Sequence, residues 1–204
     1  MRRVLVLVIG LALLVATPGL ATADVTRSAT NQKAVEVVIE RAVSQRGVPF
    51  AYGGGDASGP TKGTVEVPQS DDVAPLNQAA ADANSIELAP GLIVPNLNPV
   101  ITPPAPEPQR IEVVGFDSSG LIVYAYAGAG VKLPRSSGEQ YKVGQKVMPS
   151  LALPGDLLFY GPEGTQSVAL FIGNGQMVET TNDGVTVSPV RTKDMTPYLV
   201  RIIA

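Results

Sequence analysis

Phe116-Asp117-Ser118-Ser119-Gly120-Leu121 is the stretch that decides the fold of this 204-residue chain. An acidic residue and two serines stand directly before an apolar run, which is the pattern of a capped helix start. We therefore predict a helix over 119–128, with Asp117 as its cap. The stretch gains further interest from what the chain lacks, because none of its residues is Cys or His.

Regular elements are predicted on both sides of this turn. Residues 30–46 have apolar positions at helical spacing, and Gly47 ends that helix before an extended aromatic stretch over 47–54. Ser136 and Glu139 have the spacing of a capping box and open a third, short helix. Strands are predicted at 156–160, 168–172, 176–179, 185–188 and 198–203, with a hairpin turn at 173–175. Helices followed by a mostly antiparallel sheet of about five strands predict the α+β class.

The N-terminus has the pattern of an export signal over 1–23. Arg2 and Arg3 precede an apolar run over 4–16, and Ala21-Thr22-Ala23 supplies the small residues of a cleavage site. This run is shorter than the roughly 20 residues that cross a bilayer, and a permanent N-terminal anchor is the alternative interpretation. We expect a mature chain that begins at Asp24, is secreted to the periplasm or cell wall, and has no membrane contact after signal removal.

Residues 56–110 differ in composition from the rest of the chain. They hold ten of the eighteen prolines, and seven acidic residues against two basic ones. Proline runs such as 103–108 block regular pairing, so we predict a mostly disordered insertion in which only 76–88 has the composition of a short helix. The insertion divides one domain into 24–55 and 111–204. A protein that acts through the insertion itself is a competing hypothesis.

Composition and charge exclude several classes of protein. The net charge is −3, and the sequence offers no basic face for nucleic acid. The lack of Cys removes disulfides, and the lack of Cys and His together removes the usual ligands of zinc, copper and iron. No loop of spaced carboxylates resembles a calcium site. We expect no cofactor and no metal.

Five motifs occur along the chain in one order. They are Gly47-Val48-Pro49-Phe50, Phe116 to Leu121, Leu133-Pro134-Arg135-Ser136-Ser137, Pro154-Gly155-Asp156-Leu157 and Ser167 to Gly175. The order of these motifs and their residues resemble those of the NlpC family of papain-like cell-wall endopeptidases over 34–55 and 111–203. The likeness extends to the mycobacterial Rip group, which includes a member without the catalytic residues. It implies a papain-like fold and a role at peptidoglycan, whose stem peptides the family cuts, typically between D-glutamate and diaminopimelate.

The resemblance also implies where the catalytic residues of the family would stand. Ser118 occupies the position of the nucleophilic cysteine and Ser167 that of the histidine, while Glu179 matches the residue that orients the histidine. A thiol at a helix start ionises readily, whereas a serine hydroxyl has a pKa far above 7 and needs a positioned base. We therefore predict a pseudoenzyme. The alternative is a slow peptidoglycan peptide hydrolase in which Ser118 uses Glu179 or a lysine.

Three lysines are the other bases that this alternative could use. Lys132, Lys142 and Lys146 lie in the polar stretch after the second predicted helix. Nothing in that stretch predicts the burial that would lower the pKa of a lysine.

The resemblance implies that this chain retains the binding groove of the family. The resemblance places Arg135, Ser136 and Ser137 on a loop beside the groove, and N–H groups at a helix start attract carboxylates. We predict that peptidoglycan stem peptides contact Phe50, Tyr52, Asp117, Ser118, Ser119, Arg135, Ser136 and Ser137. Phe50 stands where the family usually has Tyr and lacks its hydroxyl. A surface ion pair is the alternative role for Arg135. Further predicted partners are catalytic relatives that compete with this protein for the cell wall.

Overall fold

The computed structural model describes residues 27–67 and 109–204. Its α-helices are α1 (Ala29–Ser44), α2 (Ser118–Ala127) and α3 (Ser137–Lys142). Its strands are β1 (Thr61–Glu66), β2 (Arg110–Gly115), β3 (Gln145–Val147), β4 (Leu157–Tyr160), β5 (Ser167–Gly173), β6 (Gln176–Thr181), β7 (Gly184–Pro189) and β8 (Leu199–Arg201). Short 3-10 turns, η3 (Pro149–Leu151) and η4 (Pro162–Gly164), flank β4. No helix in the two described ranges combines the length and the apolar character that crossing a bilayer requires.

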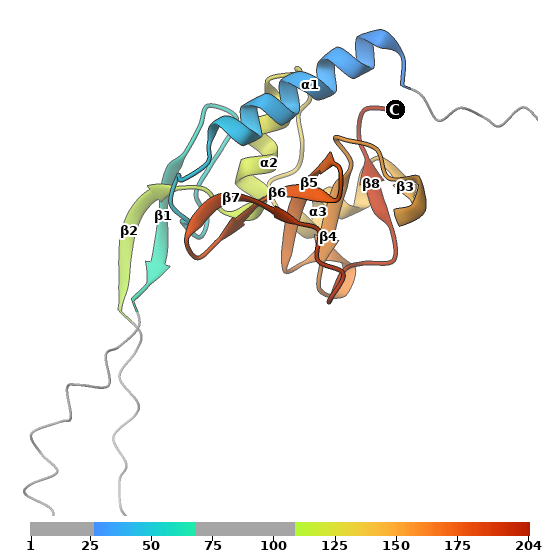
Figure 1. Ribbon diagram of the computed structural model, residues 1–204. Coiled ribbons are helices and arrows are strands. Elements are labelled where there is room, and N and C mark those ends of the chain that lie inside the picture. The colour runs from blue at the N-terminus through green and yellow to red at the C-terminus, as the bar shows by residue number, and fades with distance from the viewer. Residues whose placement is uncertain (1–26, 68–108) are drawn as a thin grey trace, which may run out of the picture.

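The helices α1 and α2 form a layer over one antiparallel sheet (Figure 1). The sheet has six strands in the order β3-β8-β4-β5-β6-β7. α2 packs on β5 and α1 packs on α2. A separate ribbon of β1 and β2 stands beside this body and leads directly into α2. The start of α2 therefore lies where the ribbon meets the helical layer.

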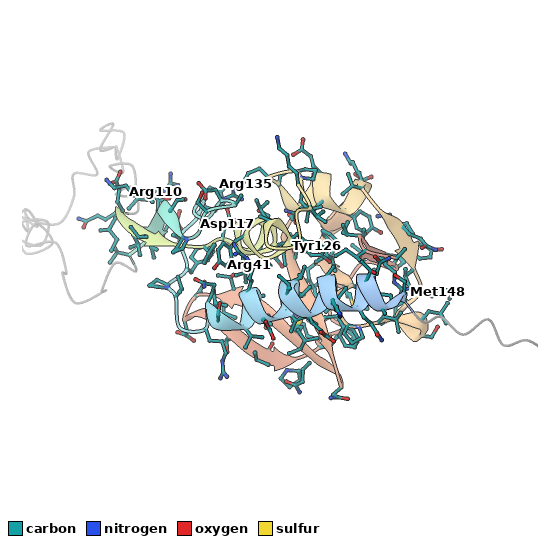
Figure 2. The ribbon with its side chains drawn as sticks, turned by 90° about the horizontal axis from the view of Figure 1, so that it is seen from above. Arg41, Arg110, Asp117, Tyr126, Arg135 and Met148 are labelled. Atoms are coloured by element: carbon teal, nitrogen blue, oxygen red, sulfur yellow. The ribbon has the colours of Figure 1, made fainter. Side chains whose placement is uncertain are left out.

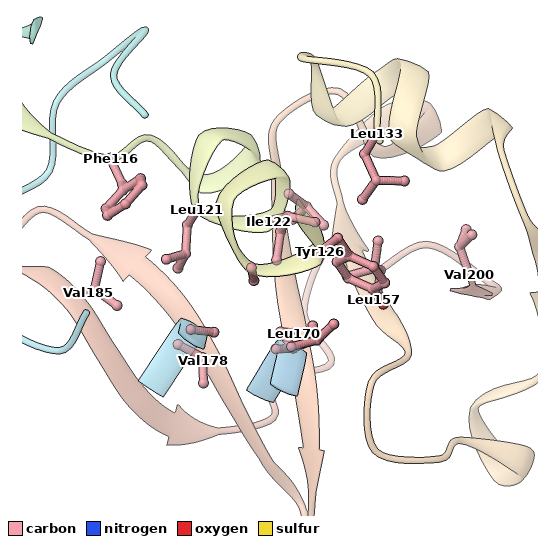
Figure 3. Close-up of a cluster of buried hydrophobic side chains, with 14 of the residues drawn as sticks. Phe116, Leu121, Ile122, Tyr126, Leu133, Leu157, Leu170, Val178, Val185 and Val200 are labelled. Carbon is pink, nitrogen blue, oxygen red and sulfur yellow. The ribbon is translucent and has the colours of Figure 1, made fainter. Parts of the chain in front are cut away.

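The main core fills the space between the helices and the sheet. Phe116, Leu121 and Tyr126 pack there against strand residues that include Leu170 and Val185 (Figure 3). Because side chains alternate along a strand, Ala169 belongs to a second cluster on the opposite face of the sheet. The sequence of α2 after its first turn is apolar on all sides, as expected for a helix between α1 and a sheet.

The predicted α+β class is confirmed, and most predicted elements are present within two residues of their bounds. The short third helix is also confirmed, since the Ser136 hydroxyl accepts a hydrogen bond from the Glu139 amide at 3.4 Å. The sheet has six strands rather than about five. The extra strand is β3, which pairs with β8 over three residues. Two of those residues are polar, so no apolar alternation indicated a strand there.

The ribbon corrects the predicted start of the insertion. Residues 61–66 form β1, which pairs with β2 from Thr61 opposite Gly115 to Glu66 opposite Arg110. The Val67 amide donates to the Gln109 carbonyl oxygen at 2.9 Å. Strand pairing therefore extends to Val67 and Gln109, the two described residues that border 68–108. Disorder was therefore the wrong prediction for 61–67, where glycine and polar residues conceal a strand. The predicted signal over 1–23, the short helix over 76–88 and residues 68–108 of the insertion lie outside the described residues.

A buried charge cluster ties the two ends of the described domain together. The carboxylate of Asp156, whose side chain is 0% exposed, accepts hydrogen bonds from Arg27 at 2.7 Å and from Arg201 at 2.7 and 2.8 Å. The Leu153 amide also donates to it at 2.8 Å. Arg27 further donates to the carbonyl oxygen of Ile203 at 2.7 Å. Asp156 thus joins the segment before α1 to the end of β8, and Arg27 itself reaches the segment after β8.

Replacement of Asp156 by Asn should destabilise the domain strongly. The change removes the charge that compensates two buried guanidinium groups, and loss of one partner from a buried pair typically costs about 3–5 kcal/mol. Urea denaturation followed by circular dichroism measures the loss. The matched control is Glu66→Gln, which breaks a 3.2 Å ion pair with Arg110 between side chains that are 65% and 63% exposed. That change should cost less than about 1 kcal/mol, and equal midpoints for the two variants would contradict the prediction.

Candidate functional site

Asp117 caps the start of α2 and holds a neighbouring loop. Its Oδ1 accepts a hydrogen bond from the Gly120 amide at 2.7 Å, which confirms the predicted cap. Its Oδ2 accepts from the Gly53 amide at 3.0 Å. One carboxylate therefore fixes both the helix start and the aromatic stretch before the ribbon. Ser118 is the first residue of the helix.

Glycine is required where this loop meets α2. A Cβ on Gly55 would lie 2.3 Å from Cδ1 of Phe116, and Gly55 has a φ of +92°. A Cβ on Gly120 would lie 2.3 Å from the carbonyl oxygen of Gly54. Backbone therefore packs directly on backbone at this point, and side chains at these positions would push the loop away from the helix.

Arg135 clamps three segments at this end of α2. Its Nη1 donates to Asp117 Oδ1 at 2.9 Å and to Ser119 Oγ at 2.8 Å. Its Nη2 donates to Asp117 Oδ2 at 2.8 Å and to the carbonyl oxygen of Gly54 at 2.9 Å. Figure 2 shows Arg135 and Asp117 side by side where the ribbon meets α2. The ion pair considered as an alternative role for Arg135 is thus present, with Asp117 as the partner. Arg135 also binds the loop through the carbonyl oxygen of Gly54.

Gln140 extends this network from α3. It is 0% exposed, and its Nε2 donates to the carbonyl oxygens of Ser119 at 3.1 Å and Pro134 at 2.8 Å. Gln140 is not among the site residues predicted from the sequence. The only signal was its position one residue after the Glu139 of the capping box, and that signal says nothing about a contact with α2. The network therefore joins α2, α3 and the loop over 53–55.

The remaining predicted groove residues lie around this network. Phe50 is half-buried and forms a bridge to Phe116, the residue before Asp117. Tyr52 is 73% exposed and bridges to Thr64 of β1. Ser136 caps α3, and Ser137 is the buried first residue of that helix. The contacts of the two serines are thus those of a helix start.

Ser167 and Glu179 lie on neighbouring strands of the sheet. Ser167 is the first residue of β5 and stands opposite Tyr160 of β4. Glu179 is buried on β6, where it accepts hydrogen bonds from the Ser188 hydroxyl at 2.6 Å and from Nη1 of Arg191. Among the described residues, no hydrogen bond joins Ser118, Ser167 and Glu179 to one another. Neither Ser188 of β7 nor Arg191 after β7 was selected from the sequence, because contacts from these residues to β6 leave no local pattern.

Among the described residues, none of the three lysines considered as alternative bases donates a hydrogen bond to Ser118, Ser167 or Glu179. Lys146 is on β3, and β8 and β4 separate that strand from β5. Lys146 is exposed, as expected, although partial desolvation lowers its pKa, and its ammonium lies over the ring of Tyr141. Lys132 borders a shallow hollow of about 300 Å³ behind α2 that contains none of the predicted site residues. In the described ranges, no group of three or more acidic side chains is placed to hold a metal ion.

Comparison with known proteins agrees with this geometry. The model of the NlpC/P60 family matches residues 105–204. The solved structure of RipD from Mycobacterium tuberculosis, described as a non-catalytic NlpC/p60 domain protein with an adaptation to peptidoglycan-binding function, is 51% identical. The match covers 83% of this chain and 97% of that one, with a TM-score of 0.58. The chain belongs to the NlpC/P60 family.

Other members of the family are similar to this chain over most of its length. The P60 domain of a Mycobacterium avium paratuberculosis antigen is 47% identical over 85% of this chain and 96% of its own, with a TM-score of 0.60. The peptidoglycan endopeptidase RipB of M. tuberculosis is 42% identical over 91% of this chain, and the chain spans 61% of the length of that protein. NlpC/P60 relatives thus include both named endopeptidases and a non-catalytic protein.

Three solved structures of RipA carry mutations that bear on the site. The mutated positions are a cysteine, a histidine and a glutamate. The intervals between those positions equal the intervals from Ser118 to Ser167 and from Ser167 to Glu179.

Replacement of Arg135 by Met should loosen the start of α2. Hydrogen bonds from a charged group contribute about 1.5–3 kcal/mol, and without Arg135 the carboxylate of Asp117 keeps only neutral donors, two backbone amides and the Ser119 hydroxyl. We expect faster hydrogen exchange at the Gly53 and Gly120 amides, measured by NMR, and lower stability to urea. The control Arg110→Met makes the same chemical change in an exposed ion pair of the ribbon and should leave both amides unchanged. Unaltered exchange in Arg135→Met would contradict the clamp.

Proposed function

We propose that this NlpC/P60 domain binds the stem peptides of peptidoglycan at the cell wall and does not cleave them. The observation that carries the proposal is the chemistry of the three positions that correspond to the family triad. Ser118 and Ser167 are alcohols, and the carboxylate of Glu179 is engaged by Arg191 and Ser188. No imidazole or thiol exists anywhere in the chain.

Proton transfer is the step that fails under this proposal. A serine attacks a peptide only when a positioned base removes its proton, because a helix dipole that suffices for a thiol cannot ionise a hydroxyl. Glu179 would have to leave a guanidinium and a hydroxyl to serve as that base. Loss of general-base catalysis alone removes about 10²–10⁴ in rate, and the lost thiol removes more.

Recognition needs none of these groups. The clamp of Arg135, Asp117 and Ser119 holds the start of α2 without any contribution from the Ser118 hydroxyl. Carboxylate and carbonyl oxygens of a stem peptide are suitable acceptors for N–H groups at a helix start. The description of RipD as peptidoglycan-binding supports the same role here. With the export signal predicted over 1–23, a secreted wall protein follows, and a binder that releases no product competes with catalytic relatives for the same peptides.

Purified cell wall should retain the mature protein while defined muropeptides stay intact. Sedimentation with insoluble peptidoglycan measures binding, and excess soluble stem tetrapeptide should release the protein. Mass spectrometry of muropeptides after prolonged incubation measures cleavage, with Ser118→Ala as the matched variant. Absence of the protein from the wall pellet would remove the proposal. A cleavage product that disappears in Ser118→Ala would establish the slow hydrolase instead.

The role of the insertion is separable in the same assay. Since Val67 and Gln109 are hydrogen-bonded neighbours, a two-residue Asn-Gly turn can replace 68–108 without altering the ribbon. Wall binding that survives this replacement places recognition in the domain. Binding that vanishes while the domain stays folded would support the competing hypothesis of a protein that acts through its insertion.

The double substitution Ser118→Cys and Ser167→His should restore measurable muropeptide cleavage. It places a thiol at the start of α2 and an imidazole opposite Tyr160, on a frame that the clamp leaves otherwise unchanged. Each single substitution serves as the control and should stay inactive, because the thiolate and its partner base act as a unit. Activity of the Ser118→Cys variant alone would show that another group supplies the base.

A further inference from the structure

Arg191 brings a guanidinium to the part of the sheet where Ser167 lies. It belongs to the segment between β7 and β8 and donates from Nη1 to Glu179 Oε2. Its guanidinium carbon lies 4.0 Å from the centre of the Tyr160 ring. The carboxylate and the aromatic face together hold this side chain in one place, because both contacts favour a planar cation.

The position of the Tyr160 ring locates the guanidinium relative to Ser167. Tyr160 and Ser167 are direct cross-strand neighbours, so their Cβ atoms lie about 5 Å apart. The Tyr160 hydroxyl contacts the sulfur of Met177 on β6 at 3.2 Å, which means that the ring crosses over β5. Glu179 lies nearer than Met177 to the end of the sheet where β5 begins. Glu179, which holds the guanidinium, therefore lies between Met177 and the end of the sheet that contains Ser167.

The side chains of Arg191 and Glu179 differ in how far they are exposed to solvent. The Arg191 side chain is 43% exposed, whereas that of Glu179 is 8% exposed. Glu179 thus holds one edge of the guanidinium from a buried position, while part of the Arg191 side chain stays open to solvent. A planar cation fixed in this way presents further N–H groups in the fork that suits a carboxylate.

We propose that Arg191 binds a free carboxylate of the stem peptide and so makes the domain selective for peptides whose carboxylates are not amidated. This inference rests on the proposed function and names the group that would discriminate among its ligands. D-Glutamate and diaminopimelate both carry carboxylates beside the peptide backbone. Amidation replaces the charged acceptor by a neutral group that also carries N–H donors, which face the donors of the guanidinium.

A purely structural Arg191 has a different signature. If it only compensates the charge of Glu179, its loss lowers stability and weakens binding of every peptide by the same factor. A carboxylate-binding Arg191 changes the ratio between two peptides. That ratio is insensitive to the fraction of folded protein, so it separates the two roles.

The test is calorimetric titration of the mature protein with two synthetic stem tetrapeptides, one with free carboxylates and one fully amidated. The wild-type protein should bind the amidated peptide about 10- to 100-fold more weakly, the range expected for loss of a hydrogen bond between charged groups. Arg191→Gln should bind both peptides with equal affinity. Equal binding of both peptides by the wild type would overturn this inference and leave the proposed function standing, whereas binding of neither would overturn both.

Two further variants guard against a folding defect. Arg191→Gln leaves the buried Glu179 without its cation, so the double variant Arg191→Gln/Glu179→Gln removes the uncompensated charge and should also show equal affinities. Glu179→Gln alone keeps Arg191 and should retain the preference for the free carboxylates. Loss of the preference in Glu179→Gln, with retention in Arg191→Gln, would contradict the assignment to Arg191.

Discussion

The carboxylate of Asp117 is the constraint on which the site depends. It accepts hydrogen bonds from the Gly120 amide at the start of α2, from the Gly53 amide and from both terminal nitrogens of Arg135. The helix start, the aromatic loop and the segment before α3 therefore share one acceptor. Since the side chain of residue 118 contributes nothing to this arrangement, the position can change from thiol to alcohol while the surrounding surface stays the same.

Two kinds of charge pairing serve different ends in this fold. Asp156 is buried between two guanidinium groups and secures the ends of the described domain, where its role is structural. Glu179 is buried as well, but its partner Arg191 is half-exposed and faces the region of Ser167. The first cluster is closed to ligands, and the second presents a cation to them. Burial of the phenol raises the pKa of Tyr160, so the ring beneath that cation stays neutral.

Local patterns in the sequence predicted the parts of the structure that local forces determine. The cap at Asp117, the capping box at Ser136 and the hairpin after β5 each involve residues within a few positions of one another. The ribbon was missed because β1 and β2 are separated by 67–109 and because β1 has no apolar alternation. Gln140 and Arg191 were missed for the same reason, since their partners belong to other elements and nothing near them in the sequence indicates the contact.

The hydrogen bond between Val67 and Gln109 has a consequence for how this gene can vary. The ribbon already brings the two chain ends together, so its pairing bears the entropic cost of closing whatever is inserted between them. That cost rises only by about 0.6 kcal/mol for each doubling of loop length. Evolution can therefore lengthen, shorten or exchange the segment between Val67 and Gln109 with little effect on folding. The tip of the ribbon is for the same reason a suitable site for inserting a reporter or an epitope.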